Sequence, residues 1–389
     1  MAYLVIFPVH VWASPGDLLE LVFKKQYSPQ EISKFIQPLF AGYELPGMDF
    51  SVDLYQAVYE STYPDGQAAR VYAQVLIPVF SGLPKRRALY VFGPGSTGLT
   101  DNCRPSREHE AGIHWGLYLA HVLSHAGRGV IAILPDYLGF GNPDREQYYM
   151  VAQAEAAALL DAVRCFEQIR KRLALKGISR TRNFLAGFSQ GGHAIFAAAD
   201  FRRSYAPEIT LSGLIGYGPT TDVTSLLLEY PSVAPMIIYT YRQLYGQSLV
   251  DPSRILREPF ASDLEEDVLS QCVGGMQAYY PEKAQNLYHP DFYNALVDGS
   301  LAVTYPGLAA ILRKNSTGLV RHGIDMLILQ GTNDVVVFPD TQRVFVDGAR
   351  SRGENVELKI FEGARHDTRQ IGFEYVQSWI TQRLRNPFF

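Results

Sequence analysis

Cysteine is scarce in this 389-residue chain, which contains only Cys103, Cys165 and Cys272. The three residues show neither a CxxC spacing nor the Cys/His spacing of a zinc site. An odd number of cysteines also argues against a disulfide framework. We therefore expect three unpaired thiols, with one bridge plus one free thiol as the alternative.

Basic charge and long apolar runs are also lacking. The chain has 35 Lys and Arg against 39 Asp and Glu, a formal net charge of −4, so we expect no nucleic-acid partner. No apolar run is long enough for a transmembrane segment. Residues 1–13 are apolar, but they lack the positive region of a secretory signal because the first lysine is Lys24. They are either a degenerate signal peptide or a segment packed on the surface.

What the chain has in abundance is apolar sequence in short runs. Hydrophobic residues make up 47% and charged residues 19%, which suits a globular protein with a sizeable core. Residues 53–63 and 69–79 alternate and flank a Pro-Asp-Gly turn, a pattern typical of a hairpin. Short apolar strands then alternate with helices, which predicts a mostly parallel sheet covered on both faces. We expect about eight strands, the later ones at 88–93, 129–137, 183–188, 211–218, 325–331 and 356–363.

The alternation stops between residues 222 and 305. This stretch has helical fragments, prolines and many tyrosines, and no apolar strand. We interpret it as a helical cap inserted after the sixth strand, over the edge where open α/β sheets bind ligands. The predicted organisation is an N-terminal extension at 1–50, an α/β core at 51–221 and 306–389, and a cap or lid at 222–305.

One hydroxyl stands between a buried strand and an alanine-rich helix. The pentapeptide Gly187-Phe188-Ser189-Gln190-Gly191 is a G-x-S-x-G sequence and resembles the nucleophile elbow of the α/β-hydrolase fold. Such a turn is tight, so we expect a positive φ at Ser189 and no room for a Cβ at 187 or 191. The hydroxyl would then sit at the positive end of the following helix.

The resemblance implies a Ser-acid-His triad in that chain order. Asp334 directly follows the seventh predicted strand and His366 the eighth, and His366 is the only histidine beyond Asp334. The hydroxyl needs the imidazole as a base, and the imidazole needs a carboxylate to orient it. The predicted catalytic residues are therefore Ser189, Asp334 and His366, with Asp222 as the alternative acid.

Two backbone N–H groups should bind the oxyanion. The first candidate is Gln190, next to the nucleophile. The second is Ser96, with Gly95 and Thr97 as near alternatives, in a glycine-containing loop at 92–106. We also expect Gly95 and Thr97 on the pocket wall. This loop, with Cys103-Arg104-Pro105-Ser106, resembles that of secretory-lipase-like hydrolases and bacterial esterases, although Pro94 replaces their leading histidine. Residues 135–143 resemble the Asp-Tyr-x-Gly-x-Gly sequence that follows the fourth strand in the same families. There we expect a structural role for Asp136 and a place for Tyr137 on the pocket wall.

These resemblances imply a serine carboxylesterase that hydrolyses short- to medium-chain esters, aryl esters included, through an acyl-enzyme. Such an enzyme needs no metal and no organic cofactor, and its partner is a small ester. The resemblance favours a secreted or periplasmic location, with a cytoplasmic one as the alternative, and homo-oligomerisation stays open. The alternatives are a lipase for longer triacylglycerols, a non-catalytic binding protein, and a capped serine aminopeptidase. The last would bind an α-amine through a cap carboxylate: Glu229, Glu265 or Glu266.

Several histidines have the spacing of functional groups but lack their context. His121 and His125 are four residues apart on a predicted helix, yet no third ligand lies nearby in sequence, so we predict no metal site. His193 follows the elbow, and we expect it to pack structurally. Glu108, His109 and His114 flank the oxyanion loop, where we expect a solvated helix start.

Overall fold

The computed structural model describes residues 13–83, 85–108, 115–175 and 177–385. The apolar N-terminal stretch, His109 and His114 lie outside these ranges, apart from residue 13. Within them, no helix combines the length and the apolar character needed to cross a membrane.

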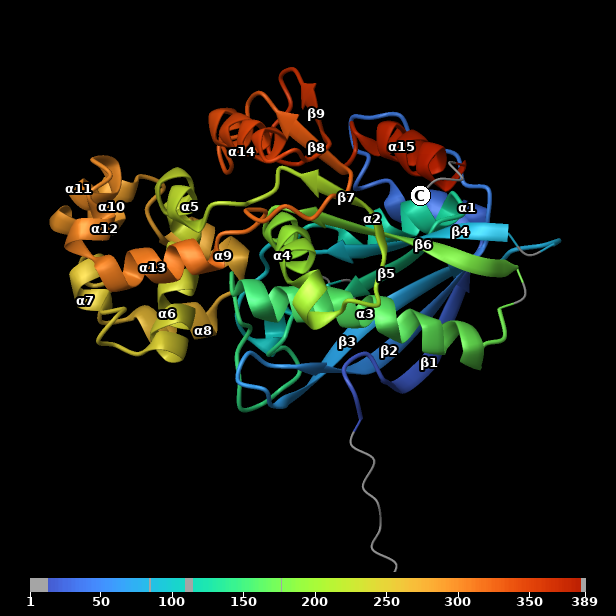
Figure 1. Ribbon diagram of the computed structural model, residues 1–389, viewed down its shortest axis with the longest axis horizontal. Coiled ribbons are helices and arrows are strands. Elements are labelled where there is room, and N and C mark those ends of the chain that lie inside the picture. Colours follow the sequence, from blue (N-terminus) through green and yellow to red (C-terminus); the bar gives the residue numbers. More distant parts are fainter. Residues whose placement is uncertain (1–12, 84, 109–114, 176, 386–389) are drawn as a thin grey trace, which may run out of the picture.

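A single nine-stranded sheet forms the centre of the described chain (Figure 1). Its strands run in the order β1-β2-β3-β5-β4-β6-β7-β8-β9, one more than the eight expected. The strands are β1 (Leu18–Tyr27), β2 (Val52–Thr62), β3 (Ala68–Pro78), β4 (Lys85–Gly93), β5 (Ile131–Pro135), β6 (Ile178–Phe188), β7 (Leu211–Tyr217), β8 (Met326–Gly331) and β9 (Val356–Phe361).

The additional strand is β1, which lies within the segment expected to be an N-terminal extension. It pairs antiparallel with β2 at the edge of the sheet, and most of its side chains are exposed. Charged residues such as Lys24 and Lys25 suit an edge strand because they discourage pairing with another chain. They also interrupt the apolar alternation, so β1 was missed. The helix after β1 begins with the expected capping box of Ser28 and Glu31.

The pairing of the other strands agrees with the sequence pattern. β2 and β3 form the expected antiparallel hairpin, with Thr62 opposite Ala68, and β3 pairs antiparallel with β5. From β5 through β4 to β9 every neighbouring pair is parallel. The carboxyl ends of β4, β6, β7, β8 and β9 therefore share one edge of the sheet.

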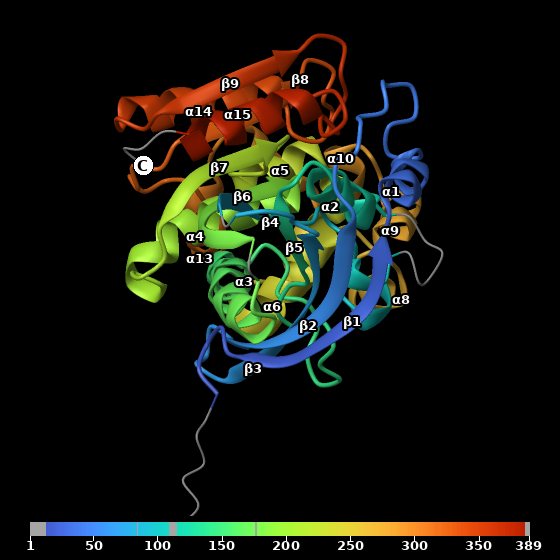
Figure 2. The same ribbon diagram turned by 90° about the vertical axis from the view of Figure 1, so that its right-hand side faces the viewer.

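Helices cover both faces of the sheet (Figure 2). One buried cluster holds apolar residues of α1 (Pro29–Ile36), α2 (Tyr118–Gly127) and α15 (Phe373–Arg385). The other holds residues of α3 (Ala152–Arg172), α4 (Gln190–Tyr205) and α14 (Pro339–Ser351). Two short 3-10 helices, η1 (Asp101–Cys103) and η2 (Pro105–Arg107), lie in the loop after β4.

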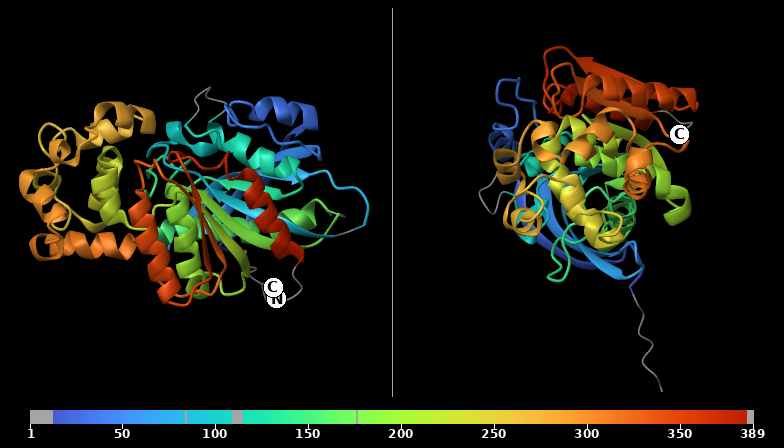
Figure 3. Two further views of the ribbon diagram at one scale, coloured as in Figure 1. Left: turned by 90° about the horizontal axis from the view of Figure 1, so that it is seen from above. Right: turned by 90° about the vertical axis from the view of Figure 1, so that its left-hand side faces the viewer.

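A helical lobe projects beyond the carboxyl edge of the sheet (Figures 1 and 3). It is the region interpreted as the cap, and it includes α13, which lies just beyond the expected boundary at residue 305. Its apolar residues continue the cluster under α3 and α4. The elements are α5 (Val223–Glu229), η3 (Pro231–Val233), α6 (Ala234–Tyr245), α7 (Pro252–Ile255), α8 (Leu264–Ser270), α9 (Val273–Tyr279), α10 (Ala284–Leu287), α11 (Pro290–Val297), α12 (Leu301–Thr304) and α13 (Pro306–Asn315).

Candidate active site

Ser189 occupies the turn between β6 and α4 with a strained backbone. Its φ is 54° and its ψ −113°, a region that non-glycine residues rarely adopt. A Cβ on Gly191 would lie 1.8 Å from the carbonyl oxygen of Gly93, and one on Gly187 would lie 2.0 Å from that of Gly191. Only glycine allows the backbones of β4, β6 and α4 to approach so closely, so the tight turn expected from the pentapeptide is present.

Asp334 and His366 meet at the same edge of the sheet, on the loops after β8 and β9. The Nδ1 atom of His366 lies 2.8 Å from Oδ2 of Asp334. The other carboxylate oxygen of Asp334 accepts hydrogen bonds from the N–H groups of Val336 and Val337, at 2.8 and 2.9 Å. The imidazole therefore faces an acceptor whose position is fixed by its own loop.

The two loops are held together by close backbone packing. A Cβ on Gly331 would lie 2.3 Å from the carbonyl oxygens of both Ala364 and Arg365, and the N–H of Asn333 donates to Ala364 at 2.9 Å. The side-chain amide of Gln330 donates to Oδ2 of Asp334 at 3.1 Å. The carboxylate and the imidazole are thus placed relative to each other by the main chain.

Ser189 and His366 line one cavity of about 590 Å³ between the sheet edge and the cap. The Nε2 atom of His366 is buried and has no hydrogen-bond partner within the described ranges. The rings of His366 and Phe188 are 4.8 Å apart. The cavity wall is largely apolar and includes Trp115, Met150, Phe188, Leu226, Val233 and Val336.

The oxyanion candidates differ in where the structure places them. Gln190 is the first residue of α4, and Ser96 lines the cavity with Ser189. Gly95, Thr97 and Tyr137 do not line it, so the expectation that they form the pocket wall is corrected. Tyr137 is buried and donates from its hydroxyl to the carbonyl of Pro94 at 2.7 Å. It supports the loop from behind.

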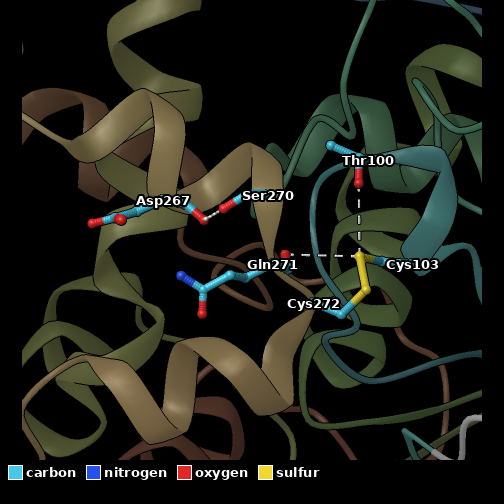
Figure 4. The surroundings of a disulfide bond; sticks show 6 residues. All are labelled: Thr100, Cys103, Asp267, Ser270, Gln271 and Cys272. Atoms are coloured by element: carbon cyan, nitrogen blue, oxygen red, sulfur yellow. Dashed lines mark hydrogen bonds between the residues drawn. A yellow bond between two sulfur atoms is a disulfide. The ribbon is translucent and has the colours of Figure 1, made fainter.

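The expectation of three unpaired thiols is wrong. Cys103 and Cys272 form a disulfide with a Cα–Cα distance of 5.5 Å, and Cys165 is free and buried. The bridge joins the loop after β4 to the start of α9 in the cap (Figure 4). Beside it, the N–H of Val273 donates to the carbonyl of Thr97 at 2.8 Å. The two cysteines are 169 positions apart in the sequence, so the sequence does not reveal that they pair.

Other residues singled out from the sequence have structural partners. Asp222, the alternative acid, accepts from the N–H of Thr224 at 2.9 Å and caps α5. His121 contacts the hydroxyl of Tyr90 at 2.9 Å, and burial lowers the pKa of His125 to about 3. Asp136, buried as expected of a structural carboxylate, accepts from the N–H of Ser106 at 2.8 Å.

The expectation of a solvated helix start around Glu108 is wrong. This side chain is buried and accepts from three successive N–H groups, those of Gly116, Leu117 and Tyr118, at 2.6 to 2.7 Å. A carboxylate facing the free N–H groups at a helix start satisfies them and complements the helix dipole. Glu108 thereby fixes the start of α2 beside the cavity.

Arg369 and Asp367 also line the cavity, although neither was expected from the sequence to belong to the site. The guanidinium of Arg369 is buried and donates to both carboxylate oxygens of Asp367, at 2.9 and 2.5 Å. It also donates to the carbonyl of Gly116 at 2.7 Å. Asp367 and Arg369 are two residues apart and do not belong to a known sequence motif. Their ion pair could therefore be recognised only in the folded structure.

Comparison with known proteins agrees with this architecture. The crystal structure of the rice cell wall degrading esterase LipA from Xanthomonas oryzae superimposes with a TM-score of 0.73, covering 95% of this chain and 97% of that one at 18% identity. Candida antarctica lipase A covers 95% and 82%, with a TM-score of 0.66 and 17% identity. The chain has the α/β-hydrolase fold.

Sequence comparisons agree with this likeness over part of the chain. The family model described as Secretory lipase matches residues 110–230 of this hydrolase-fold chain. Lipase A from Moesziomyces aphidis is 22% identical over 288 residues, which are 60% of this chain and 60% of that protein. The match therefore spans about 60% of the length of that curated relative.

Proposed function

We propose that the protein is a serine ester hydrolase with Ser189 as nucleophile, His366 as base and Asp334 as orienting acid. The observation that carries the proposal is the contact of His366 with Asp334, 2.8 Å apart, together with the place of His366 and the strained Ser189 on the wall of one cavity. The likeness to secretory lipases and to esterase structures supports the same chemistry.

The hydrogen bond to Asp334 determines which ring nitrogen of the neutral imidazole carries the proton. A carboxylate only accepts, so the proton of neutral His366 sits on Nδ1 and the lone pair is on Nε2. Ser189 Oγ attacks the ester carbonyl carbon while its proton passes to Nε2. The tetrahedral intermediate collapses, the C–O bond to the alcohol breaks, and the alcohol leaves with that proton. Water, deprotonated by His366, then attacks the acyl-enzyme and releases the acid and Ser189.

The oxyanion of each tetrahedral intermediate would accept hydrogen bonds from the N–H groups of Gln190 and Ser96. Gln190 is the first residue of α4, whose positive end favours the developing negative charge. Gln190 follows the closely packed elbow, and the hydroxyl of Tyr137 supports the loop of Ser96 at Pro94, so both N–H groups should need little reorganisation during the reaction.

The proposed substrates carry acyl groups of short to medium length, and the size of the cavity is compatible with them. A volume of about 590 Å³ lies within the range of about 300–1,000 Å³ typical of small-molecule sites. Among the described lining residues, Asp367 is the only carboxylate, and Arg369 neutralises it. Glu229 instead accepts from the N–H of Phe338 at 2.8 Å. Nothing on the described wall favours the aminopeptidase alternative.

A series of p-nitrophenyl esters from acetate to palmitate, with wild type and Ser189→Ala, tests the proposal. We expect a maximum at short or medium chain length, and a loss of roughly 10⁴–10⁶-fold in kcat in the variant. A maximum at palmitate that rises at an oil–water interface would favour the lipase alternative.

The matched control is Ser124→Ala. Ser124 is also a buried serine, and its hydroxyl donates to the carbonyl of His121 on α2 at 2.7 Å. We expect this variant to keep the wild-type rate. Equal rates in wild type and Ser189→Ala would contradict the proposed nucleophile. Failure of a fluorophosphonate to label Ser189 would favour a non-catalytic binding protein.

A further inference from the structure

A buried carboxylate lies behind the nucleophile elbow, outside the proposed triad. Glu155 is on α3, and its side chain is fully buried. One of its oxygens accepts from the side-chain amide of Gln190 at 2.8 Å and from the N–H of Met150 at 3.1 Å. The other faces Nδ1 of His193 at 2.5 Å. Such complete burial is costly unless the charge is paired and hydrogen-bonded.

The surroundings of His193 identify its protonation state. Nδ1 faces the Glu155 carboxylate, and Nε2 faces the carbonyl oxygen of Asn315 at 2.5 Å. Both partners are acceptors, whereas a neutral imidazole has a single N–H. His193 therefore carries two N–H groups and a positive charge. Glu155 raises the pKa of His193 against the opposing effect of burial.

The contacts of Glu155 link it to both oxyanion candidates, to one of them directly and to the other through a neighbouring segment. On one side, it holds the side chain of Gln190, whose own N–H is one proposed donor. On the other, it holds the N–H of Met150, which has a left-handed φ of 53°. The preceding residue, Tyr149, has its hydroxyl 2.7 Å from the hydroxyl of Ser96. A single carboxylate thus connects Gln190 directly, and Ser96 through the 149–150 segment.

We propose that Glu155, held by the charged His193, is a positioning residue that preorganises the oxyanion hole from behind. The inference rests on the proposed function. Glu155 does not touch substrate. It acts by fixing Gln190 and the 149–150 segment, so that the two N–H donors keep one geometry through both steps of the reaction.

Separate measurements of substrate binding and of oxyanion stabilisation distinguish this positioning role from a merely structural one. We would compare wild type, Glu155→Ala and Glu155→Gln on p-nitrophenyl butyrate, and measure inhibition by an alkyl trifluoromethyl ketone. This ketone forms a tetrahedral oxyanion with the serine. In Glu155→Ala we expect kcat to fall by about 10–100-fold, KM to stay within about two-fold, and the affinity for the ketone to fall in parallel with kcat. Glu155→Gln keeps an acceptor for Gln190 and should restore most of the loss.

Asp161 provides a matched control on the same helix. Its carboxylate is also fully buried, and it accepts from the hydroxyls of Ser61 and Tyr205 at 2.6 and 2.7 Å, far along α3 from the elbow. Asp161→Ala removes a comparable buried acceptor. We expect it to lower thermal stability while leaving kcat and the affinity of the folded enzyme for the ketone within about two-fold of wild type.

Gln190→Met gives a second route if Glu155→Ala does not fold. It removes the amide that Glu155 holds but keeps the backbone N–H and the Glu155–His193 pair. The same split between kcat and KM is expected. Wild-type values of kcat and ketone affinity in a folded Glu155→Ala or Gln190→Met would overturn the inference, as would the same split in Asp161→Ala. Absence of ester turnover in wild type would instead contradict the proposed function.

Discussion

The sheet edge and the cap are held by different kinds of interaction. At the edge, backbones are in direct contact: Gly191 leaves no room for a Cβ against Gly93, nor Gly331 against the 364–365 segment. The cap contributes cavity-lining residues from separate short helices. Apolar side chains that continue the core cluster, a disulfide, an isolated bridge and single hydrogen bonds join it to the core. Backbones in direct contact tolerate almost no change in geometry, whereas side-chain packing and single links allow small adjustments.

The largest expected difference is in kcat, between variants of one carboxylate in the core and one in the cap. Asp334→Asn in the core should lower kcat by about 10⁴-fold, because the imidazole loses the partner that sets its tautomer. Glu229→Gln is the control. Glu229, on α5, accepts from the N–H of Phe338 four residues after Asp334, and we expect less than a two-fold change in kcat. Ester hydrolysis measured at one pH checks both, and equal losses would contradict the contrast.

The disulfide is the covalent link between the two regions. Cys272→Ser should lower the free energy of unfolding by about 2–4 kcal/mol, because the bridge no longer restricts the unfolded chain. Cys165→Ser, which changes the free buried thiol, is the comparison. It should keep the response to reductant seen in wild type, whereas Cys272→Ser should lose it. Thermal unfolding with and without dithiothreitol measures this. A reductant-insensitive wild type would argue against the bridge.

Glycine-to-alanine substitutions test the backbone packing directly. Gly191→Ala should destabilise the protein by about 1–3 kcal/mol or more, because the new Cβ meets backbone that cannot move aside. Gly274→Ala, on α9 of the cap, places its Cβ in open space at an exposed position. It should stabilise the protein by about 0.5–1 kcal/mol, since alanine favours helix. Chemical denaturation measures the free energy of unfolding of both variants. A Gly191→Ala variant as stable as wild type would contradict the view that backbone packing at the sheet edge is tight.

The smallest expected effect is the pH dependence of stability that His193 contributes at the junction of core and cap. His193, on α4, faces Glu155 of α3 and the carbonyl of Asn315 at the end of α13, and Asp200 also raises its pKa. A raised folded pKa means that folding binds a proton. This contribution to stability is fully present below the ordinary histidine pKa of about 6.5 and is lost as pH rises through the raised value.

His193→Gln should flatten that alkaline decline in the free energy of unfolding. His289→Gln is the control, because His289 is a half-exposed histidine in the cap whose ring has two long contacts, both with Asp291: 3.4 Å to its N–H and 3.7 Å to its carboxylate. It should leave the pH profile unchanged. Denaturant titrations between pH 6 and 9 measure the slope. An unchanged slope in His193→Gln would show that this histidine is not the group that loses its proton.

Much of the core follows from local pattern. The hairpin of β2 and β3, the parallel strands, the elbow at Ser189 and the order of Asp334 and His366 all rest on residues adjacent in sequence. β1 was missed because its charged edge residues obscure the alternation. Glu108 and Arg369 were not recognised as buried groups because their partners lie in other segments. The same applies to Glu155, whose contacts with Gln190 and His193 join two helices.

The sequence by itself determined the hairpin and the parallel strands of the sheet, the tight turn at Ser189 and the loops that carry Asp334 and His366. These features depend on hydrophobic periodicity and on glycines at fixed positions, and both are local properties of the chain. Only the tertiary structure decided the Cys103–Cys272 bridge, the cavity wall and the buried charges behind the elbow. Each of these brings together residues from distant segments, and their pairing depends on the distances and burial that the folded chain creates.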